Sequence, residues 1–435
     1  MKMIKWIDGR QKTTADILKN LARPSQLEFK EQRKVVEAIV SDVKKRGEEA
    51  VLEYSKRFDK ILYDSIDDML VSKEEIEEAY GLVDLKFIDV LKKAKDNIWK
   101  FHLKQKTNSW ISFDDTSSIL GQKIQPMDRV GIYVPGGRAA YPSSVLMNAI
   151  PARIAGVEEI IMTTPPGSDG KVNPYTLIAA DILQIEKIYK LGGAQAVAAM
   201  AFGVGGIPKV DKIVGPGNIY VTLAKKEVYG YVDIDMIAGP SEILIVADDS
   251  AIPTYVAADL LSQAEHDPMA TSILITTSPS LGEKVKRELK SQLESLPLKE
   301  VAETSLRDFG AIIIADTIEQ SINIVNEIAP EHLELAIENP FKWLGMVKHA
   351  GAIFLGNYSP EPLGDYMAGP NHVLPTSGSA KFFSPLSVDD FIKKSSIIAY
   401  SKEDLKEIYK DIALFARAEG LTAHARSVEV RFEEI

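Results

Sequence analysis

Apolar positions between residues 27 and 106 recur at intervals of three and four, which is the spacing of one buried helix face. Gly47 interrupts this pattern. Ser72 is followed three residues later by Glu75, the arrangement of a capping box at a helix start. The sequence therefore predicts two or three long helices in this region.

From Arg129 onward, short apolar runs alternate with helix-like segments. The first series of runs covers residues 130–134, 160–162, 185–191, 212–214 and 232–237. The second covers 243–247, 272–276, 311–315 and 352–355, with helices expected at 254–265, 280–293 and 319–328. Alternation of this kind is typical of parallel βαβ units, so the pattern predicts an α/β fold with two doubly wound sheets. Beyond Pro385 the pattern of apolar positions predicts helices at 387–393 and 402–419, with Gly420 at a C-cap position.

Composition narrows the class of protein. The chain has 435 residues, which is more than a domain with a single hydrophobic core usually contains, so two or more domains are expected. The net charge is -11, whereas proteins that bind nucleic acids usually carry a basic surface, so no nucleic-acid partner is expected. No membrane partner is expected either. Residues 1–12 contain no apolar stretch typical of a secretory signal, so a cytoplasmic location is expected. The absence of cysteine leaves only nitrogen and oxygen ligands for a metal.

Histidines near other reactive side chains are the candidates for chemistry. Gln263 and His266 stand three residues apart at the end of an expected helix and share one face, although a histidine at a helix end also suits the helix dipole. Glu331 and His332 are neighbours after a helix that Pro330 restricts. An acid beside an imidazole suits proton transfer, while a solvated surface pair is the alternative. The spacing excludes the H-E-x-x-H zinc motif.

Two further clusters lie towards the C-terminus. Residues 362–375 are dense in glycine and proline, so we expect a long irregular loop that carries Asp365 and His372. Glu419 and His424 lie in an expected helix-turn-helix, where a surface histidine is the alternative. Gly-rich turns at 134–138, 191–195 and 214–218 follow expected strands, where the ligand crevice of such a sheet lies, although simple structural turns would look the same. None of these turns is the G-x-G-x-x-G dinucleotide fingerprint.

Eight motifs stand in order between Arg129 and Arg431: YVPGG, GGAQAVAA, GPGN, AGPSE, SQAEHDP, PEHLE, LGDYMAGPNHVLPTSGSA and EGLTAHARS. Together they resemble the histidinol dehydrogenase family. The resemblance implies a zinc-dependent enzyme that uses NAD to oxidise L-histidinol to L-histidine through L-histidinal, the last step of histidine biosynthesis. It also implies a homodimer with shared active sites.

The resemblance further implies two incomplete Rossmann-like domains with extended helical terminal segments. The expected division is an N-terminal arm (1–26), a zinc and substrate domain (27–131 and 242–386), an NAD domain (132–241) and a helical dimerisation segment (387–435). The implied zinc ligands are Gln263, His266, Asp365 and His424, and the implied acid/base pair is Glu331 and His332. The implied substrate contacts are Ser241, Gln263, His266, His332, Asp365, His372, Glu419 and His424, and the implied NAD contacts are Tyr133, Gln195 and Asn218.

Two other classes of protein remain possible on the residues alone. A zinc hydrolase could use the same histidines and carboxylates with a metal-bound water. A two-lobed solute-binding protein would share the alternating α/β pattern, but such proteins need an export signal. Formation of NADH from histidinol separates these classes from a dehydrogenase.

Overall fold

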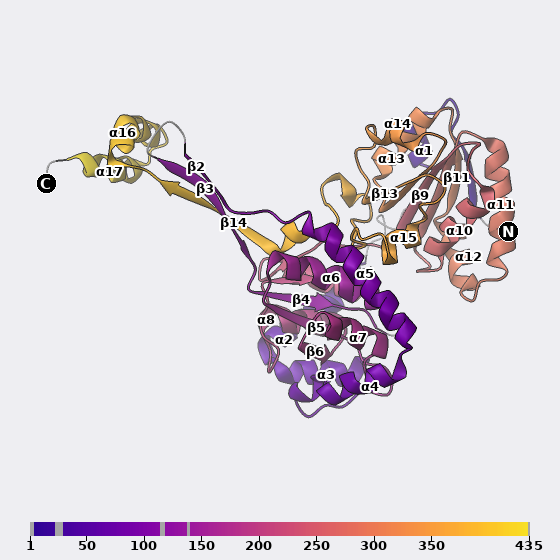
Figure 1. The fold of residues 1–435 in the computed structure, drawn as a ribbon, viewed down its shortest axis with the longest axis horizontal. Coiled ribbons are helices and arrows are strands. Elements are labelled where there is room, and N and C mark those ends of the chain that lie inside the picture. Colours follow the sequence, from indigo (N-terminus) through magenta and orange to yellow (C-terminus); the bar gives the residue numbers. More distant parts are fainter. Residues whose placement is uncertain (1–3, 22–28, 114–117, 137–139, 434–435) are drawn as a thin grey trace. The chain divides into compact units, whose positions relative to one another are not determined.

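The computed structural model describes residues 4–21, 29–113, 118–136 and 140–433 (Figure 1). The chain forms two compact units: unit 1 contains residues 1–105 and 127–391, and unit 2 contains residues 106–126 and 392–435. Among the described residues, no helix combines the length and the apolar character needed to cross a bilayer.

One half of unit 1, here called the β4 lobe, is built on a five-stranded parallel sheet with the order β6-β5-β4-β7-β8. Its strands are β4 (Arg129–Tyr133), β5 (Glu159–Thr164), β6 (Lys187–Lys190), β7 (Lys212–Val214) and β8 (Asp233–Ile234). They match the first expected series. The chain runs outward from β4 in one direction and then returns to add β7 on its other side, so the β4/β7 boundary is a topological switch point.

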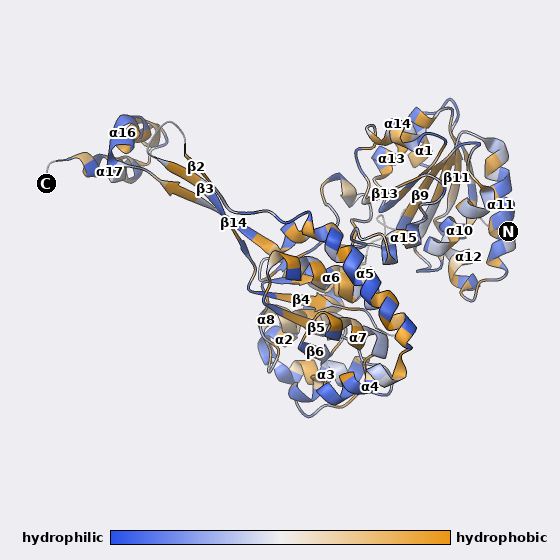
Figure 2. Cartoon of the chain, viewed as in Figure 1, coloured by the Kyte–Doolittle hydropathy of each residue, from blue (hydrophilic) through white to orange (hydrophobic). Residues whose placement is uncertain are grey.

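The connecting helices of this lobe are α6 (Pro142–Ala155), α7 (Pro174–Ile182), α8 (Gly193–Phe202) and α9 (Ile219–Val228). Four more helices come from the N-terminal region: α2 (Lys30–Arg46), α3 (Glu48–Phe58), α4 (Lys73–Leu82) and α5 (Leu85–Leu103). The break at Gly47 and the capping box at Ser72 are both confirmed. Blue and orange bands along α3, α4 and α5 in Figure 2 show their amphipathic character.

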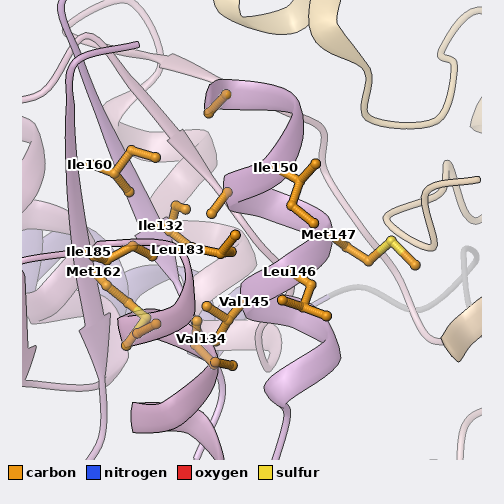
Figure 3. Close-up of a cluster of buried hydrophobic side chains, with 14 of the residues drawn as sticks. Ile132, Val134, Val145, Leu146, Met147, Ile150, Ile160, Met162, Leu183 and Ile185 are labelled. Atoms are coloured by element: carbon orange, nitrogen blue, oxygen red, sulfur yellow. The ribbon is translucent and has the colours of Figure 1, made fainter. Parts of the chain in front are cut away.

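The N-terminal helices pack on the β4 lobe. Ile88 and Leu91 of α5 share a buried cluster with Ile132 of β4 and Leu146 of α6, part of which is drawn in Figure 3. The expected domain division grouped residues 27–131 with residues 242–386, which form the other sheet. The observed packing differs, because these helices contact the β4 lobe. An amphipathic pattern shows that one helix face is buried but not which sheet covers it.

The other half of unit 1, the β9 lobe, has a six-stranded parallel sheet with the order β1-β11-β10-β9-β12-β13. Its strands are β1 (Lys5–Asp8), β9 (Glu242–Ala247), β10 (Thr271–Thr276), β11 (Ala311–Ile314), β12 (His332–Ala336) and β13 (Ala352–Leu355). Its helices are α1 (Thr14–Leu18), α10 (Pro253–Ala264), α11 (Pro279–Leu293), α12 (Lys299–Asp308), α13 (Ile318–Ile328) and α14 (Pro340–Leu344). The second expected series is confirmed, but β1 and the wholly buried β12 were not expected as strands.

A segment that follows β13 joins the two lobes. Residues expected as an irregular loop begin instead with a short helix, α15 (Glu361–Tyr366). Beyond it, Asn97 of α5 donates to the Met367 carbonyl at 2.9 Å. Asn371 donates to the Met147 carbonyl of α6 at 2.7 Å. The segment that carries Asp365 and His372 is therefore anchored on the β4 lobe as well.

Unit 2 pairs β14 (Ile392–Ala399) with β3 (Ile119–Pro126), which also pairs with β2 (Trp110–Phe113), in an antiparallel sheet. The helices α16 (Lys402–Ala418) and α17 (Thr422–Glu429) complete it. The helix expected at 387–393 is wrong: a 3-10 turn at Val388–Phe391 leads directly into β14. The partner of β14 lies more than 260 residues earlier in the chain, so local helical spacing could not reveal the strand.

Candidate active site

A cavity of about 1570 Å³ in unit 1 is lined by residues from both lobes. Ten of the twelve expected site residues line it: Tyr133, Gln195, Asn218, Ser241, Gln263, His266, Glu331, His332, Asp365 and His372. They come from positions as far apart in the sequence as 133 and 372, so the fold alone brings them together.

The two lobes present opposite edges of their sheets to this cavity. The β4 lobe contributes Tyr133 at the carboxyl end of β4 and the turn after β7, as is usual for ligand sites in open α/β sheets. The β9 lobe contributes Ser241 just before β9 and His332 at the first position of β12, which are amino ends. Because α10 runs back antiparallel to β9, its last turn places Gln263 at that same edge.

Glu331 and His332 are held by the main chain of Glu242, the first residue of β9. The Glu242 N–H donates to Glu331 Oε2 at 2.8 Å, and the Glu242 carbonyl lies 3.0 Å from His332 Nδ1. Burial lowers the pKa of His332 to about 4, so this imidazole is neutral at pH 7. Burial also raises the pKa of Glu331 well above its usual range, with smaller contributions from nearby carboxylates such as Asp365. The surface-pair alternative is therefore wrong.

The cavity holds a group of side chains that can bind a metal ion. Ligand atoms of His332, Glu361 and Asp365 lie within 4.8 Å of one another. Asp365 Oδ1 also lies 3.7 Å from His372 Nδ1. Asp365 is common to this group and to the expected zinc ligands, whereas Glu361 was missed. Glu361 stands four residues before Asp365. In a helix this spacing puts the two side chains on one face, but the sequence did not indicate that α15 is helical.

The surroundings of the Gln263 side chain indicate whether the site fits a metal ion. This side chain is fully buried, and neither its Oε1 nor its Nε2 atom has a hydrogen-bond partner among the described residues. A buried amide without partners costs stability, so its presence here needs a ligand to satisfy it. Gln263 lines the cavity together with His266 and Asp365. This set of nitrogen and oxygen donors fits zinc.

The β4-lobe end of the cavity carries Tyr133, Gln195 and Asn218. The Tyr133 hydroxyl accepts from the Gly193 N–H at 3.2 Å, at the start of α8. Asn218 caps α9 by accepting from the N–H groups of Tyr220 and Val221. Gln195 is buried, and its Nε2 has no hydrogen-bond partner in the described part of the chain.

A buried ion pair supports this end of the cavity and was not anticipated. Lys225 and Asp235 pair with each other and both bind Gly215: the lysine donates to the Gly215 carbonyl at 2.9 Å and the aspartate accepts from its N–H at 2.9 Å. Gly215 has φ +115°, and a Cβ there would collide with the Tyr133 carbonyl. The pair thus keeps the turn that leads to Asn218 packed against Tyr133.

The last two expected site residues belong to unit 2. Glu419 is the C-cap of α16, and His424 lies in α17 after Gly420, whose φ is +77°. The expected helix-turn-helix is confirmed, and Gly420 follows the C-cap residue, one position later than expected. Neither Glu419 nor His424 is among the residues that line the cavity of unit 1. Gly137 and Arg138 of the first glycine-rich turn lie outside the described residues.

Comparison with known proteins gives a consistent result. The model of the histidinol dehydrogenase family matches residues 22–432. The chain is 57% identical over 430 residues to the histidinol dehydrogenase of Caldanaerobacter subterraneus subsp. tengcongensis, covering 99% of each chain. It is 54% identical over 432 residues to that of Bacillus subtilis (strain 168), again covering 99% of each.

Solved structures agree. The crystal structure of the histidinol dehydrogenase from Elizabethkingia anophelis superposes with a TM-score of 0.93 at 41% identity, covering 99% of this chain and 98% of that one. An acetylating aldehyde dehydrogenase from Geobacillus thermoglucosidasius reaches a TM-score of 0.50 at 14% identity, which is a likeness of fold alone.

Proposed function

Because this chain belongs to the histidinol dehydrogenase family, and so is an oxidoreductase of histidine biosynthesis that acts on histidinol, we propose a zinc- and NAD-dependent route for its reaction. L-histidinol is oxidised to L-histidinal and then to L-histidine, and each step transfers one hydride. The observation that carries this proposal is the neighbouring pair Glu331 and His332, buried in one cavity with the unsatisfied amide of Gln263.

The metal would be held by Gln263, His266 and Asp365, with His424 as a fourth ligand. When bound, zinc supplies a Lewis-acid anchor for the imidazole and amino nitrogens of the substrate. NAD, when bound, supplies the hydride acceptor at the end of the cavity that carries Tyr133, Gln195 and Asn218. Ser241, His372 and Glu419 contact the substrate.

His332 acts in the first step. The Glu242 carbonyl can only accept a hydrogen bond, so the proton of the neutral imidazole sits on Nδ1. The lone pair of Nε2, which lies 3.7 Å from Glu361 Oε1, can accept a proton. His332 Nε2 takes the hydroxyl proton of histidinol as the hydride leaves the carbinol carbon, and the aldehyde forms. A neutral imidazole with an unprotonated Nε2 is the form that a general base requires.

Glu331 acts in the second step. The chain has no cysteine, so no thiol is available to hold the aldehyde covalently. Glu331 takes a proton from water as the water oxygen bonds to the aldehyde carbon, which forms the gem-diolate. The gem-diolate loses the second hydride to give the carboxylic acid, which then loses a proton to become the carboxylate. The Glu242 N–H favours the ionised form of Glu331. Burial is the main cause that raises the pKa of Glu331 and favours its protonated form, and the Asp365 charge adds to it; a cation bound to Asp365 would remove only this added repulsion.

Unit 2 supports the homodimer in this proposal. Among its described residues, the buried apolar cluster consists of Ala413, Ala416 and Ala425, which is too small to stabilise the unit alone. Large apolar side chains are about 70% exposed on it: Phe113 (73%), Ile398 (72%), Leu414 (70%) and Phe415 (70%). We propose that a second copy covers this surface and that His424 and Glu419 of each subunit complete the active site of the other.

The test is the stoichiometry of the reaction. Purified protein with excess NAD should form two NADH per L-histidinol, followed at 340 nm, with L-histidine as the product by mass spectrometry. Removal of zinc by a chelator should abolish turnover, and added zinc should restore it. One NADH per histidinol, or full activity in protein free of zinc by elemental analysis, would contradict the proposal.

A further inference from the structure

An acidic side chain of the β4 lobe has no role in the proposed reaction. Asp59 is the C-cap residue of α3 and lines the cavity together with Arg57 and Phe58. Its Oδ2 atom is inaccessible to solvent and has no hydrogen-bond partner among the described residues. Arg57 does not compensate it: its guanidinium lies over the Phe58 ring, 5.2 Å from the centroid.

Asp59 lies near the end of the cavity assigned to NAD. Burial, followed by smaller effects that include the Asp59 charge, raises the pKa of Tyr133 to about 12. Burial raises the pKa of Tyr63 to about 12 as well, and Asp59 is again among the contributing charges. The Tyr63 hydroxyl is another buried group without a partner in the described residues. A carboxylate in this setting calls for a ligand that brings hydrogen-bond donors.

The topology of the β4 lobe indicates which ligand supplies them. In dinucleotide-binding sheets an acidic residue near the end of the second strand binds the ribose hydroxyls of NAD. Here the second strand is β5, followed by Pro165, Pro166 and Gly167, and the first carboxylate of the loop after it, Asp169, does not line this cavity. Pro165 lines the cavity beside Gly193 and Gln195. Asp59 brings a carboxylate to the same cavity from a helix outside the sheet.

We propose that Asp59 binds the 2′- and 3′-hydroxyl groups of the adenosine ribose of NAD and thereby selects NAD over NADP. The inference rests on the proposed use of NAD. Both hydroxyl groups donate to the carboxylate and satisfy it. A 2′-phosphate would remove one donor and place negative charge against another buried negative charge. Burial raises the pKa of Asp59 to about 6, so the carboxylate is ionised at pH 7.5.

The test measures binding rather than turnover. The dissociation constants of NADH and NADPH are measured by fluorescence titration at pH 7.5 for the wild type, Asp59→Asn and Asp64→Asn. We expect Asp59→Asn to weaken NADH binding by about 10- to 100-fold, the loss of a hydrogen bond to a charged group, and to change NADPH binding by less than about 3-fold. Asp64 is exposed and does not line the cavity, so its variant should match the wild type.

A second measurement does not depend on any variant. Wild-type protein is titrated calorimetrically with ADP-ribose and with 2′-phospho-ADP-ribose, and the first should bind at least about 10-fold more tightly. Equal binding of the two probes, or unchanged NADH binding by Asp59→Asn, would overturn the role of Asp59 while leaving the use of NAD intact. A wild type that binds no NADH would instead overturn the proposed function and this inference with it.

Discussion

The backbone carbonyl of Glu242 lies 3.0 Å from Nδ1 of His332 and so determines which tautomer of that imidazole exists in the active site. The two residues begin neighbouring parallel strands, β9 and β12, whose register sets His332 beside Ile243. The sheet itself therefore orients the proposed base. Any variant that keeps a donor at the Nδ1 position should keep this geometry.

His332→Asn is such a variant, because the asparagine amide can still donate to the Glu242 carbonyl while the basic nitrogen is lost. We expect the rate of alcohol oxidation to fall by about 100- to 10,000-fold with little change in thermal stability. Stopped-flow measurement of the first NADH tests this. His349→Asn, outside the cavity, is the control, and a variant that oxidises histidinol at the wild-type rate would exclude His332 as the base.

Glu331→Gln separates the two half-reactions. The glutamine carbonyl can still accept from the Glu242 N–H, but it cannot take a proton from water. We expect oxidation of L-histidinal to fall by about 100- to 10,000-fold and oxidation of L-histidinol to fall much less. Single-turnover measurement of the two NADH equivalents decides this, and equal losses in both steps would remove Glu331 from the hydration step.

Gln263→Leu should separate stability from metal binding. The buried amide has no hydrogen-bond partner in the described residues, so replacing it with an apolar side chain should raise the unfolding free energy of metal-free protein by about 1–2 kcal/mol. The same change removes a ligand and should weaken zinc binding. Urea unfolding and zinc titration measure the two effects, and unchanged zinc affinity would contradict the ligand assignment.

Shared sites can be tested by mixing two inactive variants. His266→Ala and His424→Ala are co-expressed so that subunits pair at random. If His424 serves the partner, each mixed dimer contains one intact site, and half of all dimers are mixed, so about a quarter of wild-type activity should return. If His424 serves its own subunit, every site keeps one lesion and the mixture stays inactive. Active His424→Ala protein would indicate a surface histidine. Sedimentation must first show that both variants dimerise.

The Asp59 carboxylate should make stability depend on pH. Burial raises its pKa from 3.8 to about 6, so the folded protein binds the proton more tightly than the unfolded chain does. The unfolding free energy should therefore fall as pH rises from about 4 to 7. After allowance for its partial exposure, the loss is about 1 kcal/mol. Asp59→Asn should lack this loss in urea unfolding without ligand, and identical pH profiles would contradict the raised pKa.

Much of this protein could be predicted from its sequence. Alternating short apolar runs and helical segments identified nine of its parallel strands, and the break at Gly47 and the cap at Ser72 marked helix ends. The eight motifs pointed to the family and to ten residues that line one cavity. These features are local, because periodicity, caps and turn residues act over a few positions of the chain.

Other features depended on contacts between distant segments. The strand β14 pairs with β3 across more than 260 residues, and the N-terminal helices pack on the β4 lobe, neither of which leaves a local signal. Glu361, Asp59 and the Lys225 and Asp235 pair are ordinary charged residues in the sequence and become notable only through burial. Burial, charge pairing and the Nδ1 tautomer of His332 are properties of surroundings that form only when the chain folds.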